Sequence, residues 1–561
     1  MRMILLVTVT LPACLFATTA CMWNGSENAA TPIAYEPNEL LDDLEIDNLQ
    51  GDAILNIANR TEANITDSTR LVVRGNNVFA VDLYRQLSRQ SQGKNLFFSP
   101  YSISTALMMT AEGASDKTLK EMIQTLRVPS ELISGRPYTD RIWNLKDVHK
   151  AFATIDTALV GSDADRERKE PIRQRLEAIR TRIESIDVHI KHLSSESRYD
   201  EIEEFQRKQE DLVAQFDRLS PLVDYYEIHT ANALWGERTF PFNQDFVDTV
   251  DRHYKTGGIF PVDFKSNPRA AKQRINDWTA SQTRDRIKEI ISNLPPRSRL
   301  ILTNAIYFKG DWSVPFEESQ TKPRDFTMAD GIRTDTPTMH QYGMEIARYG
   351  AFNADGSTFN TPWTIDRNQQ DHSSHYPDAN GFLTVELPYK GEALSMILLV
   401  PNRPDGLSAL EAKLSADALD RWIEQMQKRE TNIFLPRFKM ETEYKLTGVL
   451  QAMGMRRAFI DPLSNTQFGA DFSGMNDSMS INDRLYIDQV LHKGFIEVNE
   501  KGTEAAAVTA VMMVGSALAP APPTMIPFIP TVAADRPFLY LIRDRETGSI
   551  LFLGRMMEPV R

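Results

Sequence analysis

The segment Glu497 to Ala510, EVNEKGTEAAAVTA, places the tightest constraint on the fold of this chain. Ile496 and Val498 are β-branched and predict a strand. Gly502 then permits a turn, because glycine lacks a Cβ. From Gly502 onward small residues dominate, so this segment can lie exposed and can also enter a sheet between existing strands without displacing bulky neighbours.

Side chains alternate between the two faces of an extended chain. The small face would carry Thr503, Ala505, Ala507 and Thr509, and the opposite face Glu504, Ala506 and Val508. No proline occurs between Gly502 and Gly515, and proline would remove a ladder donor. Composition alone favours an alanine-rich helix start or a linker, and only the rest of the chain reverses that preference.

The composition is that of an ordinary globular protein, with 42% hydrophobic and 25% charged residues among 561. The net charge of −13 argues against a nucleic-acid partner, since such proteins carry basic patches. Cys14 and Cys21 are the only cysteines, so the body has no disulfide framework and no CxxC site. Its stability must come from a large packed core.

Residues 1–21 predict a signal peptide, because Arg2 precedes a short apolar run and a group of small residues. Thr-Thr-Ala-Cys ending at Cys21 resembles the cleavage box of bacterial lipoproteins, and Leu-Pro-Ala-Cys ending at Cys14 is a second candidate. Plain signal-peptidase cleavage near Ala20 is the alternative. We expect an extracellular protein, or a lipoprotein tethered to the outer or periplasmic side of a membrane. Residues 22–70 are polar and acidic and predict an arm or tether.

Residues 71–561 predict an α+β body, with helices first and then many strands in mainly antiparallel sheets. The stretch from Asn95 predicts a strand, a Ser-Pro turn and an amphipathic helix, with Ser99 extended before Pro100 and Ser102 and Ser104 available as helix caps. Residues 382–401 and 536–556 each predict two strands around a turn.

Two segments predict insertions into this body. Residues 165–219 carry a heptad seam, a polar break and a second seam, which predict two antiparallel helices. The two seams are Ile172, Leu176, Ile179, Ile183, Ile186, Ile190, Leu193 and then Ile202, Phe205, Gln209, Leu212, Phe216, Leu219. The hairpin either covers its own apolar stripes or binds a partner. Residues 350–380 predict a surface loop, with His372 and His375 exposed to solvent.

Enzyme chemistry has no assembled motif in this sequence, since GxSxG, HExxH, Walker and GxGxxG patterns are absent. We therefore expect no enzyme activity, no cofactor and no metal site. His492 lies on the strand that leads to the small-residue segment. It predicts a core histidine with satisfied hydrogen bonds, close to Ser99 and Asn304.

Several long motifs in the right order resemble the serpin family of serine protease inhibitors. They are NLFFSPYSIS (95–104), LTNAIYFKGDW (302–312), VELPYKG (385–391), HKGFIEVNEKGTEAAAVTA (492–510) and RPFLYLIRDRETGSILFLGRM (536–556). The resemblance implies three β-sheets, about nine helices and an exposed reactive-centre loop over residues 500–535. Within that family, the chain resembles a bacterial-type secreted or lipoprotein member with a helical-hairpin insertion.

The resemblance also implies a mechanism. A target protease attacks the loop, forms an acyl-enzyme through its own nucleophile, and is trapped when the cut loop enters the main sheet as a new strand. The hinge residues implied by the likeness are Glu500, Gly502, Thr503, Glu504, Ala505, Ala506, Ala507 and Thr509. Ser99, Ser102, Asn304 and His492 would form the shutter beneath the sheet, and Trp312 the breach at its top.

The family's usual spacing places the cut after Ser516 and before Ala517, with Gly515 and Leu518 as neighbouring alternatives. Small and apolar residues around this bond predict serine proteases of elastase-, subtilisin- or chymotrypsin-like specificity as covalent partners. The interval before Arg536 is longer than usual, and its prolines predict an extended segment on the leaving side. The alternatives are inhibition of cysteine proteases, or a non-inhibitory binding protein that uses the hairpin. We expect a monomer.

Overall fold

The structure, a computed structural model, describes residues 65–559 apart from short internal gaps. The gaps are 134–143, 161–162, 196–197, 220–225, 255–256, 295–297, 368–372, 466, 477, 479, 481–483 and 504–524. The described residues fall into two compact units, Thr181–Asp211 and the remaining body. The expected signal peptide, with Cys14 and Cys21, and residues 22–64 of the expected arm lie outside the described residues.

The first helices of the body begin at side-chain caps. Helix α3 (Asp67–Gln90) starts after Thr66, whose hydroxyl accepts the backbone N–H of Thr69, so the last residues of the expected arm are helical. Helix α4 (Pro100–Ala111) starts after Ser99, which accepts the N–H of Ser102. Ser102 and Ser104 are therefore inside the helix, and their expected role as caps is wrong. All of α4 is buried, so it is not amphipathic either.

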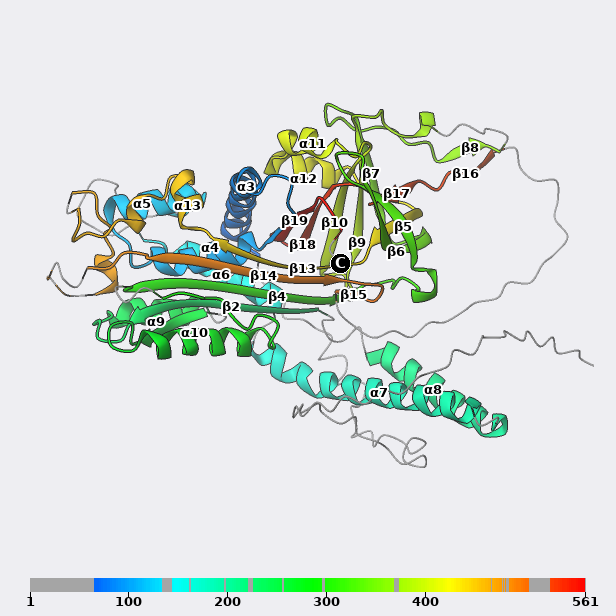
Figure 1. Cartoon of the computed structure of the whole chain (residues 1–561), viewed down its shortest axis with the longest axis horizontal. Helices are drawn as coiled ribbons and strands as arrows, with labels where there is room; N and C mark the ends of the chain where they lie inside the picture. The colour runs from blue at the N-terminus through cyan, green and yellow to red at the C-terminus, as the bar shows by residue number, and fades with distance from the viewer. Residues whose placement is uncertain are drawn as a thin grey trace, which may run out of the picture. The chain divides into compact units, whose positions relative to one another are not determined.

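The main sheet has the order β13 (Phe438–Lys445), β14 (Gln489–Val498), β4 (Leu300–Asp311), β2 (Tyr226–Glu237), β3 (Gly257–Val262). A short strand, β15 (Gly502–Thr503), also pairs with β4. β14 runs parallel to β4, and β2 runs antiparallel to it. Figure 1 shows these long strands side by side.

Strand β4 is buried on both faces, and its residues from Leu300 to Phe308 are all buried. Leu302 and Ile306 belong to the large central core, whereas Ile301 and Ala305 belong to a second core with residues of α10 (Pro268–Gln282). In Figure 1, α10 lies along one face of the sheet and α4 along the other. Successive side chains of β4 therefore alternate between two separate cores.

The other strands form two larger sheets and one small ladder. The second sheet has the order β1 (Leu96–Phe98), β19 (Ile550–Met556), β18 (Phe538–Asp544), β10 (Leu394–Pro401), β9 (Phe382–Pro388), β7 (Arg348–Phe352), β11 (Gln427–Lys428). The third has the order β17 (Thr531–Ala533), β12 (Thr431–Pro436), β6 (Arg333–Met344), β5 (Lys322–Thr327), and β16 (Met525–Pro527) pairs with β8 (Thr364–Asp366). The strand pairs expected within 382–401 and 536–556 are confirmed.

The α+β class and the three larger, mainly antiparallel sheets are confirmed. The described residues form eleven α-helices, of which two belong to the expected hairpin, so nine lie in the body. The helices not yet introduced are α5 (Asp116–Thr125), α6 (Lys146–Val160), α7 (Asp163–Ser195), α8 (Tyr199–Leu219), α9 (Gln244–His253), α11 (Leu407–Lys413), α12 (Ala416–Glu424) and α13 (Thr447–Met453). No helix among the described residues is long and apolar enough to cross a membrane.

Helices α7 and α8 pack antiparallel and cover their own apolar stripes. The Gln209 amide donates to the Asp187 carboxylate at 2.6 Å, and the His189 and Phe205 rings lie 4.6 Å apart. The seam residues buried in the structure are Ile172, Leu176, Ile179, Ile183, Ile186, Leu193, Ile202, Phe205, Leu212 and Leu219. The apolar surface of the hairpin is thus used internally.

The expected surface loop at 350–380 begins later and is more structured than its composition indicates. Residues up to Phe352 belong to β7, which is paired inside the second sheet. The segment then contains β8 and a short 3-10 helix, Ser373–His375. His375 is only 8% exposed and its ring meets that of Phe528 edge-on at 5.0 Å. The expected exposure of His375 is therefore wrong, because distant aromatic residues cover it; His372 lies outside the described residues.

Candidate functional site

A buried polar network links three neighbouring strands of the main sheet to helix α4. The registers place His492 opposite Asn304, and Asn304 opposite Asn232. The Asn304 amide donates to Asn232 Oδ1 and to Ser102 Oγ, and Ser102 Oγ donates to Asn232 Oδ1 at 2.9 Å. The structure thus brings together Ser102, Asn304 and His492. Asn232 is a member that the sequence did not reveal, because an asparagine in a strand carries no signal of its own.

His492 is held as a neutral imidazole. The backbone N–H of Ser99 donates to His492 Nε2 at 3.2 Å, so Nε2 is the unprotonated nitrogen. Nδ1–H then donates to Asn304 Oδ1. Complete burial, which disfavours a charged ring, lowers the pKa of His492 to about 3. His492 is the satisfied core histidine that the sequence predicts.

The main sheet opens at one end, between β14 and β4. Their ladder stops at Phe495 opposite Tyr307, although β14 continues to Val498 and β4 to Asp311. This leaves the last residues of β4 without β14 on that edge. The sheet therefore has a free edge at the point where β14 ends.

The chain after β14 turns back and occupies this free edge. Gly502 lies opposite Asp311, and Thr503 lies opposite Gly310, in antiparallel pairing. The other edge of β4 is already taken, because Gly310 also lies opposite Tyr226 of β2. Residues Gly502 and Thr503 therefore stand in line with a strand that would run between β4 and β14.

Backbone hydrogen bonds fix the turn from Asn499 to Gly502. The N–H of Trp312 donates to the carbonyl of Lys501 at 2.7 Å, and its indole N–H donates to the carbonyl of Asn499 at 3.0 Å. The Trp312 ring is buried and stacks on Tyr389 with ring centres 4.7 Å apart. Trp312 therefore acts as a rigid support for the turn.

Gly502 is required by both conformation and space. Its φ is +146°, a region that side chains with a Cβ rarely adopt, and an added Cβ would lie 2.1 Å from the carbonyl oxygen of Gly310. The close approach of this backbone to β4 depends on the missing side chain.

Glu500 anchors the start of the hinge. It is 3% exposed, ion-pairs with Arg437, and accepts from the hydroxyl of Thr321. Its backbone carbonyl accepts the N–H of Phe316 at 2.7 Å. Arg437 was missed from the sequence, because it lies between two strands and matches no motif.

Comparison with known proteins identifies this arrangement. A family profile described as Serpin (serine protease inhibitor) matches residues 74–559. The chain belongs to the serpin family. It is 31% identical to an uncharacterized serpin-like protein of Thermococcus kodakarensis, over 87% of this chain and 86% of that protein. It is 32% identical to Serpin B3 of Homo sapiens (86% and 98%) and 30% identical to the leukocyte elastase inhibitor of Xenopus laevis (86% and 97%).

Solved serpin structures share the fold. A complex of thyroxine-binding globulin with thyroxine matches with a TM-score of 0.60 at 24% identity, over 87% of this chain and 99% of that one. Uncleaved ovalbumin also matches with a TM-score of 0.60, at 22% identity, over 87% and 100%. At these identities the likeness concerns the fold alone.

In this serpin, the free edge of β4 also carries a partly buried carboxylate. Burial raises the pKa of Asp311 to about 6, although Lys309, Arg180 and Lys390 oppose the shift. Arg180 belongs to α7, at the base of the hairpin. The hinge therefore pairs with a residue whose charge depends on pH in the mildly acidic range.

Part of the expected hinge and all residues expected at the scissile bond lie outside the described residues. The hinge residues are Glu504, Ala505, Ala506, Ala507 and Thr509, and those at the bond are Gly515, Ser516, Ala517 and Leu518. The structure places the two ends of this segment, at Thr503 in β15 and at Met525 in β16.

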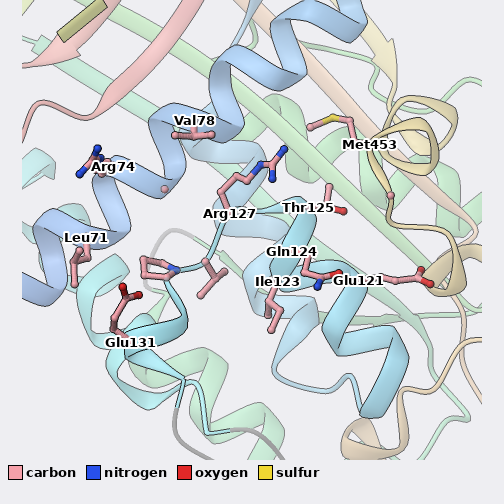
Figure 2. Close-up of a pocket in the computed structure, with 14 residues that line it drawn as sticks. Leu71, Arg74, Val78, Glu121, Ile123, Gln124, Thr125, Arg127, Glu131 and Met453 are labelled. Carbon is pink, nitrogen blue, oxygen red and sulfur yellow. The ribbon is translucent and has the colours of Figure 1, made fainter. Parts of the chain in front are cut away.

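A pocket of about 690 Å³ lies between α3, α5 and α13, and Figure 2 shows its lining. Its charged groups already have partners. Arg127 ion-pairs with Asp82 at 2.7 Å, and Glu121 accepts the backbone N–H of Arg457 at 2.7 Å. No histidine, cysteine or serine lines this pocket. Among the described residues no group of three or more His, Cys, Asp or Glu side chains could hold a metal ion.

Proposed function

We propose that this serpin is a suicide-substrate inhibitor of serine endopeptidases with small or apolar specificity. The observation that carries the proposal is the pairing of Thr503 with Gly310 on the free edge of β4. The first residues of the hinge already follow the path of a new strand. Relatives whose names describe inhibitors, such as the leukocyte elastase inhibitor, support the same reading.

The register of β15 predicts the inserted state. Gly502 lies opposite Asp311 and Thr503 opposite Gly310, so continuing the same antiparallel register brings Met513 opposite Leu300, where β4 begins. The segment from Thr503 to Met513 would thus fill the whole edge of β4. Ser516 would follow just beyond the end of the strand, which supports a cut after Ser516 as the point where insertion is complete.

Insertion has a definite cost and a definite gain. β14 must separate from β4, which breaks their ladder and the bond between His492 and Asn304. An inserted strand would pair with both neighbours, and about ten ladder hydrogen bonds at roughly 1 kcal/mol each, plus burial of the small face, would more than offset this loss. The uncleaved form is then metastable and held by a kinetic barrier.

The test is formation of a covalent complex. Pancreatic elastase, neutrophil elastase and subtilisin should each give a detergent-stable complex, and mass spectrometry should show a released fragment that begins at Ala517. Trypsin serves as the negative arm, because no Arg or Lys lies between Gly502 and Arg536. A papain-like enzyme tests inhibition of cysteine proteases. Clean cleavage without a complex would show a non-inhibitory binding protein instead.

We also propose that the protein is exported and lipidated at Cys21. The signal-like residues 1–21 and the acidic arm that follows support this location. Labelling with radioactive palmitate in a bacterial host should mark the native chain and not Cys21→Ser. Equal labelling of both chains, with loss of label in Cys14→Ser, would move the site to Cys14.

A further inference from the structure

The chain that leaves the reactive-centre loop is attached to the second insertion. Strand β16 pairs antiparallel with β8, with Met525 opposite Asp366 and Ile526 opposite Ile365. β8 lies in the segment that the sequence predicts only as a surface loop. Figure 1 shows β8 and β16 paired beside the third sheet. The long loop and the insertion, which look unrelated in the sequence, build one structure.

Arg429 joins the insertion to the residue after β16. Its guanidinium donates to the carbonyl of Phe528 at 2.7 Å and to the carbonyl of Thr361 at 3.1 Å, and it lies 4.5 Å from the centre of the Trp363 ring. The backbone N–H of Phe528 donates to the carbonyl of Trp363 at 2.9 Å. Arg429 is only 6% exposed, so these bonds are shielded from water.

Tyr376 extends this attachment toward the third sheet. Its hydroxyl accepts the backbone N–H of Thr531 at 3.0 Å, and its ring meets that of Phe528 edge-on at 5.7 Å. From Thr531 onward the chain is β17, which pairs with β12. Residues 525–533, which we name the leaving stem, are therefore held along their whole length.

An uncleaved loop is tethered at both ends, and this limits how far it can insert. Inserting the chain from Thr503 to Ser516 would carry Ser516 roughly 40 Å from the hinge end of the sheet, at about 3.3 Å per residue. The eight or so residues from Ala517 to the stem reach at most about 28 Å. Figure 1 shows β16 on the side of β15, away from the start of β4 where the inserted segment would end. Complete insertion of an intact loop therefore requires the stem to leave β8, whereas a cut before Ala517 removes this requirement.

We propose that residues 353–381 lock the leaving stem, so that the uncleaved loop cannot insert while the cleaved loop inserts freely. This inference rests on the proposed function, since it takes the cut to lie upstream of Met525. The insertion then preserves the active, metastable form without slowing inhibition, because its bonds break only on the unproductive route.

A reversible cross-link tests the lock directly. Ile365→Cys with Ile526→Cys places two thiols at directly opposed positions of β8 and β16, and the native cysteines lie only at 14 and 21. The oxidised and reduced forms of this one full-length variant are compared at elevated temperature. The measured quantity is the rate at which the uncleaved protein converts to a form with its loop inserted. This conversion is detected as a loss of loop cleavage in limited proteolysis, and the readout does not require inhibition.

We expect the oxidised form to convert at least tenfold more slowly than the reduced form and to inhibit elastase with unchanged stoichiometry. Equal conversion rates, or an oxidised form that is cleaved without trapping the protease, would overturn the lock. Failure of the proposed function has a different signature, which is the absence of any covalent complex in the unmodified chain. In that case the difference between the conversion rates of the oxidised and reduced forms would still test the lock.

Weakening the lock gives the opposite expectation. In Tyr376→Phe and in Arg429→Gln, the uncleaved form should convert to the loop-inserted form several-fold faster than in the unmodified chain. Tyr342→Phe is the matched control, because Tyr342 is 65% exposed on β6 and its ring meets those of His340 and Phe434, which both lie outside 525–533. A conversion rate in Tyr376→Phe equal to that of Tyr342→Phe would contradict a role for the hydroxyl.

Discussion

Arg437 forms an ion pair with Glu500 at the point where β14 leaves the main sheet. The carboxylate is 3% exposed, whereas the arginine side chain is 43% exposed. The pair therefore covers a buried charge with a residue that reaches in from the surface. Because Glu500 begins the turn that carries Gly502, this contact holds the hinge in its starting position.

Replacing Arg437 should destabilise the uncleaved protein. Arg437→Gln leaves the buried carboxylate with only the Thr321 hydroxyl, and we expect the free energy of unfolding to fall by about 1–3 kcal/mol. Urea denaturation measures it. Arg333→Gln is the control, since its ion pair with Asp325 is exposed on both sides and should change stability by less than about 0.5 kcal/mol. Equal losses in the two variants would contradict the anchoring role of Arg437.

Adding a methyl group at Gly502 should release the hinge. In Gly502→Ala the new Cβ collides with the backbone of Gly310, so the turn must move away from β4. We expect faster amide exchange in peptides covering 310–316 and 499–503. The free energy of unfolding should fall by at least about 1 kcal/mol. Gly448→Ala in α13 has open space and should be neutral or stabilising. Unchanged exchange at the hinge would show that the pairing of β15 is not needed.

The pH dependence of stability should reveal two groups with opposing effects, the buried His492 and the partly buried Asp311. The folded pKa of His492 is lowered from 6.5 to about 3, so the unfolded chain binds the extra proton and stability falls as pH decreases through this range. The folded pKa of Asp311 is raised from 3.8 to about 6, so this group has the opposite sign between those values. In the native chain the two contributions largely cancel between pH 6 and 4.

In Asp311→Asn, the pH dependence of stability that His492 contributes should therefore no longer be cancelled. We expect its stability, relative to the native chain, to fall by up to about 1.4 kcal/mol per pH unit between pH 6 and 4. Urea midpoints at several pH values measure this difference. The double variant Asp311→Asn, His492→Asn should lose the slope. Parallel profiles for the native chain and Asp311→Asn would rule out titration of Asp311 between pH 6 and 4.

Under the proposed inhibitory function, a charge on the small face of the hinge should turn this protein from an inhibitor into a substrate. Thr503 pairs with Gly310 of β4 and belongs to the small-residue face of the hinge, so insertion of Thr503→Arg would have to place a guanidinium among the small side chains. We expect at least tenfold more inhibitor to be consumed per protease trapped, with unchanged cleavage of the loop. Glu504→Arg adds the same side chain on the opposite face and should inhibit normally. Normal inhibition by Thr503→Arg would contradict insertion.

Local sequence patterns were sufficient for most of the strands and for the hairpin. The paired apolar runs in 382–401 and 536–556 and the heptad seams depend on neighbours within a few turns or strands along the chain, so the local sequence is enough to predict them. Ser102 shows the limit of this reasoning. Serine is a common helix cap, but Ser99 takes that position here. The Ser102 hydroxyl instead donates a hydrogen bond to Asn232, 130 residues away.

The sequence by itself determined the small-residue hinge, the glycine at its turn and the order of motifs that the serpin family shares. Only the tertiary structure decided which residues complete these features. Arg437 meets Glu500 across 63 residues, and Arg429 meets Phe528 across 99. Such pairs carry no local periodicity, because their partners lie far apart in the chain and meet only in the folded sheets. The pairing of β8 with β16, on which the proposed lock rests, is likewise decided by the tertiary structure alone.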